Sequence, residues 1–81
     1  MPEFLCRMVD SWSSLTVSSL SASDAAEQFV RAFLPELVHG TCGVSSVEVR
    51  DDFGRSFWRV TDQNKDGVRV VHAVMYRTSS R

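Results

Sequence analysis

The stretch VEVRDDFGRSFWRVTDQNKDGVRVVHAVMY, residues 47–76, decides the fold of this chain. Apolar and polar residues alternate along most of it, a period of two that is typical of β-strands with two unlike faces. Two breaks, at 51–54 and 63–67, are rich in the Asp, Asn and Gly residues that form tight turns. The second break ends in Asp-Gly, a strong short-range signal for a hairpin. The stretch therefore predicts three strands joined by two turns.

The same alternation predicts which side chains share a face. We expect one side to face a helix, and it holds Val47, Val49, Trp58, Val60, Val68, Val70, His72, Val74 and Tyr76. The opposite side holds Glu48, Arg50, Phe57, Arg59, Thr61, Arg69, Val71, Ala73, Met75 and Arg77.

Two shorter segments upstream also have the pattern of strands. Residues 3–9, EFLCRMV, place Phe4, Cys6 and Met8 on one face, with Leu5 and Arg7 on the other. Residues 15–18, LTVS, alternate again and are rich in β-branched side chains. We expect the second segment to pair back on the first as a hairpin.

A helix is predicted to begin at Ser23, whose hydroxyl can cap free amides, with Asp24 in the first turn where the helix dipole favours an acid. An apolar stripe follows at spacings of three and four, formed by Ala26, Phe29, Val30, Phe33, Leu34 and Leu37. Glu27, Gln28 and Arg31 take the solvated side. Pro35 should end the helix near Phe33, or let it restart as one turn over 35–39 before Gly40. Residues 39–43 are expected to form a loop, and 78–81 a polar tail.

The predicted order is strand, strand, helix, strand, strand, strand. One amphipathic helix can cover one face of a sheet, so the fold class is α+β: two layers, one helix packed on an antiparallel sheet of four to five strands. With 81 residues and 43% hydrophobic content, residues 1–81 form a single domain. The other sheet face must then meet water or a partner.

Composition excludes several functions. A net charge of -1 argues against a dedicated DNA-coating protein. No secretory segment and no run near the ~20 apolar residues of a membrane span are present, so we expect a cytoplasmic protein. Cys6 and Cys42 are too far apart for a local metal pair, and we interpret them as reduced thiols, with a disulfide as the minor alternative.

No motif for catalysis or for binding a cofactor is found. We therefore expect no enzyme activity, no cofactor and no bound metal. His39 and Cys42 stand three residues apart but lack a third ligand nearby and an identifiable oxyanion site. Asp62, Asn64 and Asp66 faintly match a calcium loop, yet no glutamate follows at the required spacing, position 73 being Ala.

The candidate site is instead a surface. The predicted outer face mixes arginine with apolar and aromatic side chains, a composition enriched at protein interaction sites. The residues expected to bind a partner are Arg59, Arg69, Arg77, Phe57, Met75 and Arg7. Two alternatives stay open: the tail or the loop carrying Trp12 folds over this face, or the arginine stems alone shield it.

The segments SASDAAEQFV (21–30) and VEVRDDFGRSFWRVT (47–61), set in a small strand-strand-helix-sheet chain, resemble phage and mobile-element proteins that include anti-CRISPR inhibitors. The resemblance implies a non-enzymatic protein that blocks a bacterial defence complex through surface contacts. Our first hypothesis is accordingly a monomer or weak homodimer that occupies a surface on a larger protein or ribonucleoprotein. The alternative expectation is a small nucleic-acid-binding regulator that uses the arginine-rich sheet face. No membrane partner is expected.

Overall fold

The computed structural model describes residues 2–35 and 40–80, except for the side chain of Ser80. Its elements are β1 (Glu3–Met8), β2 (Ser14–Ser18), α1 (Ala22–Phe33), β3 (Cys42–Arg50), β4 (Gly54–Lys65) and β5 (Val68–Ser80). The predicted order of strands and helix is confirmed.

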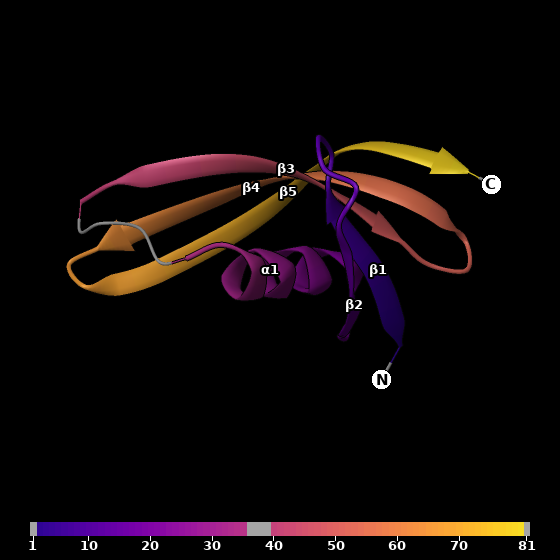
Figure 1. Cartoon of the computed structure of the whole chain (residues 1–81), viewed down its shortest axis with the longest axis horizontal. Helices are drawn as coiled ribbons and strands as arrows, with labels where there is room; N and C mark the ends of the chain where they lie inside the picture. The colour runs from indigo at the N-terminus through magenta and orange to yellow at the C-terminus, as the bar shows by residue number, and fades with distance from the viewer. Residues whose placement is uncertain (1, 36–39, 81) are drawn as a thin grey trace.

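The strands form one open sheet in the order β2-β1-β3-β4-β5, with every neighbouring pair antiparallel. The sheet arches over α1, which covers one of its faces (Figure 1). We call the face toward α1 the inner face and the opposite one the outer face. This arrangement confirms the predicted two-layer α+β fold.

The turn between β4 and β5 is the shortest that a hairpin can have. Asp66 and Gly67 both have positive φ, 55° and 81°, as a type I′ turn requires. The Asp-Gly prediction is confirmed, although the turn is shorter than 63–67 because Gln63 pairs with Val70 in the sheet. In the other turn the Asp51 carboxylate accepts the backbone N–H of Phe53 at 2.8 Å, which confirms its role as a turn residue.

Helix α1 begins earlier than predicted. Ser21, not Ser23, is the N-cap: its Oγ accepts the N–H of Asp24 at 3.2 Å. An N-cap oxygen reaches the amide of the second or third helical residue, and Asp24 is the third, so Ser23 lies inside the first turn. The helix ends at Phe33 as predicted, and the N–H of Leu34 donates to the Val30 carbonyl before Pro35.

The buried side of α1 is formed by Ala25, Ala26, Phe29 and Val30. The predicted stripe is therefore confirmed at its centre. Phe33 is 43% exposed, although its ring stacks on that of Phe29 at 5.0 Å. Leu37 and the turn predicted over 35–39 lie outside the described residues.

Two strands are longer than predicted. β3 starts at Cys42, which pairs with Gln63, so the expected loop at 39–43 is wrong for its last two residues. β5 continues to Ser80, which lies opposite Gly54, so the expected polar tail is part of the sheet as far as that residue. Hydrogen bonds along the whole β3–β4–β5 meander extend these strands past the alternating pattern.

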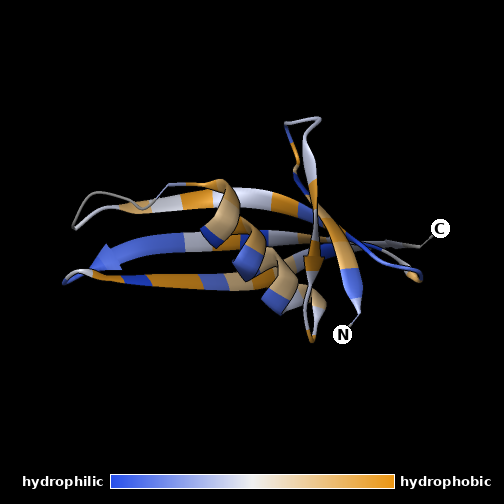
Figure 2. Ribbon diagram, turned by 60° about the horizontal axis from the view of Figure 1, so that its bottom comes forward, coloured by the Kyte–Doolittle hydropathy of each residue, from blue (hydrophilic) through white to orange (hydrophobic). Residues whose placement is uncertain are grey.

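The hydrophobic core lies between α1 and the inner face. Figure 2 shows hydrophobic residues along both the helix and the strands. Its buried members are Phe4, Cys6, Val17, Ala25, Ala26, Phe29, Val30, Val47, Val49, Val60, Val71 and Ala73. The predicted inner residues of β1 and β3 are confirmed.

In β5, by contrast, the predicted faces are exchanged. Val71 and Ala73 are buried against the helix, whereas Val70 is 44% exposed and Val74 54% exposed. His72, expected on the helix side, is exposed on the outer face. The prediction was wrong because β5 carries apolar residues at both parities, so hydrophobicity alone could not decide its orientation.

Candidate partner-binding surface

One row of side chains crosses the outer face from strand to strand. In the sheet register Arg7 lies opposite Glu48, Glu48 opposite Phe57, and Phe57 opposite Arg77. Because residues opposite one another point to the same face, this row confirms that Arg7, Phe57 and Arg77 lie together on the outer face.

Two of the arginines on this face lie over aromatic rings. The Cζ of Arg77 is 5.1 Å from the centroid of the Phe57 ring, and the Cζ of Arg59 is 5.2 Å from that of Tyr76. The two rings lie next to each other, with centroids 6.4 Å apart. Each contact stabilises the arrangement by about 0.5–1 kcal/mol at an exposed site. The guanidinium groups are thereby oriented before any partner arrives.

Tyr76 and Arg77, although adjacent in sequence, both lie on the outer face because of a β-bulge. Phe57 pairs with Arg77 while the next residue, Trp58, pairs with Met75, which leaves Tyr76 as an extra residue of β5. The prediction that Tyr76 faces the helix was wrong. The bulge also returns Arg77 to the outer face, although Arg69, at the same parity along the strand, points inward.

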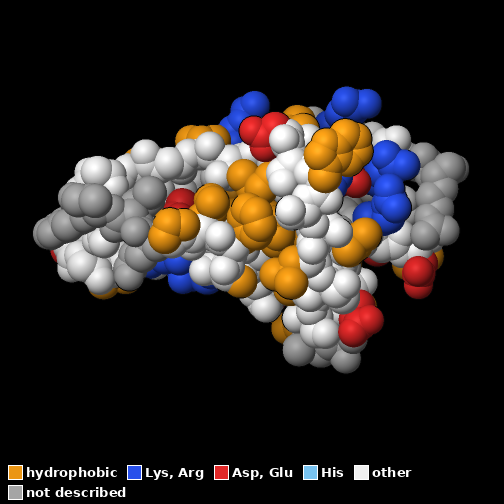
Figure 3. Space-filling view, viewed as in Figure 1, with side chains coloured by type: hydrophobic (Ala, Val, Ile, Leu, Met, Phe, Trp, Pro, Cys, Tyr) orange, Lys and Arg blue, Asp and Glu red, His pale blue; other side chains and the backbone are white. Residues whose placement is uncertain are grey.

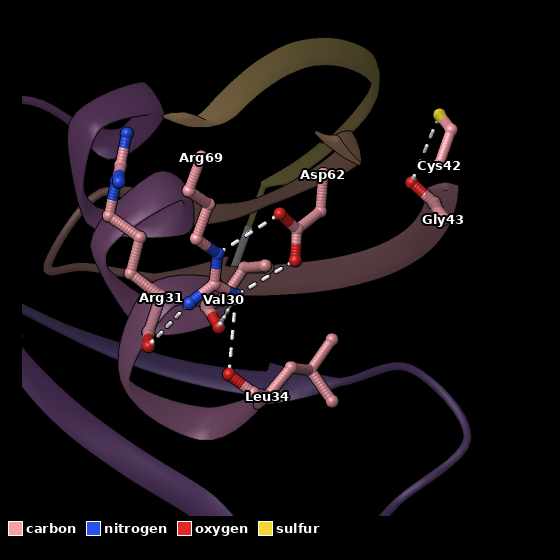
Figure 4. Close-up of polar contacts among 7 residues, drawn as sticks. All are labelled: Val30, Arg31, Leu34, Cys42, Gly43, Asp62 and Arg69. Carbon is pink, nitrogen blue, oxygen red and sulfur yellow. Dashed lines mark hydrogen bonds and ion pairs between the residues drawn. The ribbon is translucent and has the colours of Figure 1, made fainter. Parts of the chain in front are cut away.

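Arg69 is not part of the outer face, contrary to the prediction. Its Nε and Nη2 donate to the Asp62 carboxylate at 3.0 and 2.8 Å (Figure 4). Its guanidinium also donates to the carbonyls of Val30, Arg31 and Leu34 at 3.2–3.3 Å. These carbonyls lie at the end of the helix, where acceptors lack a full set of intrahelical donors, so Arg69 fastens the C-terminus of α1 to the sheet. Its role is structural.

Met75 and Val71 also lie on the inner face, where the prediction had placed neither. Val71 belongs to the core. Met75 lies opposite Trp58, and both line a hollow of about 310 Å³ beside Ala22, the first residue of α1. Met75 is 48% exposed because the helix does not extend over this end of the sheet. It is therefore separated by the sheet from Arg59 and Arg77.

Arg7 is held by internal acceptors. Its Nη2 forms an ion pair with Glu48 at 2.7 Å, and the Glu48 side chain is only 6% exposed. Its Nη1 donates to the carbonyls of Met8, Val9 and Ser11 at 3.3, 3.1 and 3.0 Å. Arg7 thus braces the β1–β2 hairpin, and its predicted contact with a partner stays a prediction.

Neither segment that could have covered the outer face does so. Trp12, in the β1–β2 loop, is 98% exposed. Residues 78–80 are part of β5 rather than a tail folded back on the sheet. Within the part of the chain that the structure describes, the outer face is therefore open to solvent apart from Glu48, which is buried beside Arg7.

The predicted partner-binding residues leave out two further arginines of this face. Arg50 on β3 and Arg55 on β4 are directly opposite each other, and both are exposed. Like charges in this position repel, so the pair favours an anion nearby. Blue side chains along the upper rim of Figure 3, where the outer face is seen edge-on, show cations gathered on this side. The alternation Arg55, Phe57, Arg59 contains the signal that could have found Arg55.

The residues with chemical reactivity do not form a second site. Cys6 and Cys42 are free thiols, as predicted, the first buried and the second exposed. Burial raises the pKa of the Cys6 thiol to about 11, which keeps it protonated and unreactive. His39 lies outside the described residues, so the His39–Cys42 pair has no described geometry. Among residues 2–35 and 40–80, no cluster of three or more metal-ligating side chains occurs.

No helix within the described ranges is long and apolar enough to cross a membrane. Comparisons with protein-family models, with curated proteins and with solved structures find no match to this chain.

Proposed function

We propose that this chain is a non-enzymatic binding protein that acts through its outer face on a larger protein or ribonucleoprotein. The observation that carries the proposal is the pair of Arg–aromatic contacts, Arg77 over Phe57 and Arg59 over Tyr76, on a sheet face that no described segment covers. Arginine and tyrosine dominate interaction hot spots, and side chains ordered before binding lose less entropy when a partner docks.

Charge defines the partner surface. The outer face carries Arg7, Arg50, Arg55, Arg59, Lys65 and Arg77, and the acids at its outward strand positions are Glu3 and Glu48. Glu48 is neutralised by Arg7. A positively charged face of this kind fits an acidic protein surface or the phosphate backbone of the RNA in a ribonucleoprotein. Together with the resemblance to anti-CRISPR-type phage proteins, it supports an inhibitor that occupies a bacterial defence complex.

A second candidate is binding of single-stranded nucleic acid. It is favoured by the neighbouring rings of Phe57 and Tyr76, because exposed aromatic rings on a sheet can stack bases. Arg77 and Arg59 already lie over these rings, however, and a base would have to displace them. We therefore rank protein or ribonucleoprotein binding first.

The test compares two charge reversals of equal size. Arg59→Glu reverses an exposed cation of the outer face, and Arg31→Glu reverses an exposed cation of α1, on the opposite side of the sheet. Wild-type protein is used to capture a partner from bacterial lysate, and the purified partner is then titrated with each variant. We expect the outer-face variant to lose binding and the control variant to keep it.

Titration with single- and double-stranded oligonucleotides at two salt concentrations separates the second candidate. Binding to phosphate weakens steeply with salt, so tight, salt-sensitive binding of an oligonucleotide alone would favour the regulator. Equal loss of partner binding in both charge-reversal variants would contradict the proposed surface.

A further inference from the structure

The two edge strands of the sheet differ greatly in length. β2 has 5 residues, whereas β5 has 13 and is the longest strand of the sheet. Monomeric proteins blunt long edge strands with lysine, proline or charged side chains, because unpaired backbone groups recruit other strands. Residues 70–76, VVHAVMY, contain no lysine, proline, arginine or acid.

The backbone of β5 offers hydrogen-bonding groups on its open side. The N–H of Ala73 donates to Glu27 Oε2 of α1 at 3.0 Å, so it points away from β4. In an antiparallel ladder alternate residues share this direction, and the backbone of Val71 therefore also faces outward. Glu27, expected on the solvated side of the helix, covers one N–H of this edge.

The side chains of the edge form an apolar stripe. Val68, Val70, Val74 and Tyr76 are 61%, 44%, 54% and 45% exposed along one strand of the outer face, with His72 at the middle. Arg69 is turned inward by Asp62, and Arg77 follows the bulge. The strand is thus exposed and apolar over the length that a second strand would cover.

We propose that β5 pairs antiparallel with β5 of a second copy of this chain, about a two-fold axis at His72. This centre sets each Val70 opposite Val74 of the partner subunit and each Val68 opposite Tyr76 of the partner subunit. Every apolar side chain of the stripe then meets another apolar one. A centre one residue further along would instead place Arg69 opposite Arg77 of the partner subunit.

Charge at the ends of the stripe fits this register. Arg77 comes beside the partner's β4–β5 turn, which carries Asp66, and opposite charges there favour the antiparallel arrangement. Glu27 must release the N–H of Ala73 so that it can bond to Val71 of the partner subunit. The two sheets become one, and both outer faces lie on the same side of it.

The test uses sedimentation velocity of the purified chain over a wide range of concentration. We expect the wild-type chain to form dimers. In Val70→Lys/Val74→Lys two pairs of lysines would face each other across the interface, so the dissociation constant should rise about tenfold or more. Val70→Glu/Val74→Lys places opposite charges in those pairs and should restore the dimer. Glu27→Ala, which frees Ala73, should tighten it.

Val44→Lys is the matched control, because Val44 is 59% exposed on β3, away from the edge. It should dimerise like the wild type. A wild-type chain that stays monomeric at every concentration would overturn the proposal. An unchanged dissociation constant in Val70→Lys/Val74→Lys would also overturn it. Failure of Val70→Glu/Val74→Lys to recover would overturn the axis at His72. Partner binding by the outer face is a separate measurement and does not decide this result.

Discussion

Arg69 of β5 and Asp62 of β4 form a two-point ion pair on the inner face, and the same guanidinium binds the last carbonyls of α1. The side chains are 13% and 5% exposed. One residue thus neutralises a buried acid and holds the helix end against the sheet. An arginine that the sequence pattern assigns to a partner surface is instead a joint between the two layers.

Replacing Arg69 should therefore destabilise the fold. Arg69→Met leaves Asp62 without this charge partner and removes the hydrogen bonds that Arg69 donates to three carbonyls at the end of α1. We therefore expect the free energy of unfolding to fall by about 3 kcal/mol. For a domain of this size the midpoint of thermal unfolding should fall by more than about 10 °C. Arg59→Met removes an exposed cation and should cost less than about 1 kcal/mol. Equal losses in the two variants would contradict the structural role of Arg69.

The Arg7–Glu48 pair predicts a non-additive result. Arg7→Met leaves the Glu48 carboxylate buried without this counter-ion and should cost about 3 kcal/mol of stability. Arg7→Met/Glu48→Gln removes the stranded charge, so it should be more stable than Arg7→Met alone. Chemical denaturation of the two single variants and the double variant measures the coupling. Simple addition of the two single losses would argue against a direct pair.

The two thiols should react at very different rates. Cys42 is exposed, whereas Cys6 is buried and its pKa is raised to about 11 by burial, so its reactive thiolate is scarce at neutral pH. A disulfide reagent should label one thiol per native chain and a second only after unfolding. Cys42→Ala should abolish the rapid labelling and leave partner binding unchanged. Rapid labelling of Cys6 in that variant would show that the core packing is different.

Asp24 predicts a loss of stability in acid. Hydrogen bonds from Ser19 and Gln28 lower the pKa of this carboxyl below its usual value. A carboxyl with a lowered folded-state pKa stabilises the fold above its unfolded-state pKa, and this contribution disappears as the pH falls through the folded-state value.

Asp24→Asn should therefore be less stable than the wild type at neutral pH and converge with it in acid. Urea titrations at several pH values measure the difference. Asp52→Asn, at an exposed turn position, is the comparison. A gap that persists unchanged into acid would mean that Asp24 acts through packing rather than through its charge.

The sequence predicted the turns and the layer arrangement because these depend on local chemistry. Asp66-Gly67 favours positive φ at both positions, and Pro35 cannot continue a helix. The N-cap was displaced by two residues because Ser21 and Ser23 are equally good caps by composition. In the structure Ser21 is the N-cap, and Ala25 and Ala26 are buried under the sheet.

The orientation of β5 could not be read from alternation. It depends on Asp62, which is 7 residues from Arg69 in sequence, and on the carbonyl end of α1, where Arg31 is 38 residues away. Together these acceptors make an inward-facing arginine favourable. For the same reason Tyr76 was missed at the candidate surface, since it shares the parity of Val70 and Val74 along the strand.

The bulge at Tyr76 determines how β5 would respond to the deletion of a residue, as well as which side chains share a face. Two residues of β5, Tyr76 and Arg77, stand opposite Phe57, so deleting Tyr76 would close the bulge and leave Arg77 opposite Phe57 on the outer face. Substitution scanning would never sample that change. A single deletion could thus remove the ring under Arg59 while keeping every other residue of β5 on its present face.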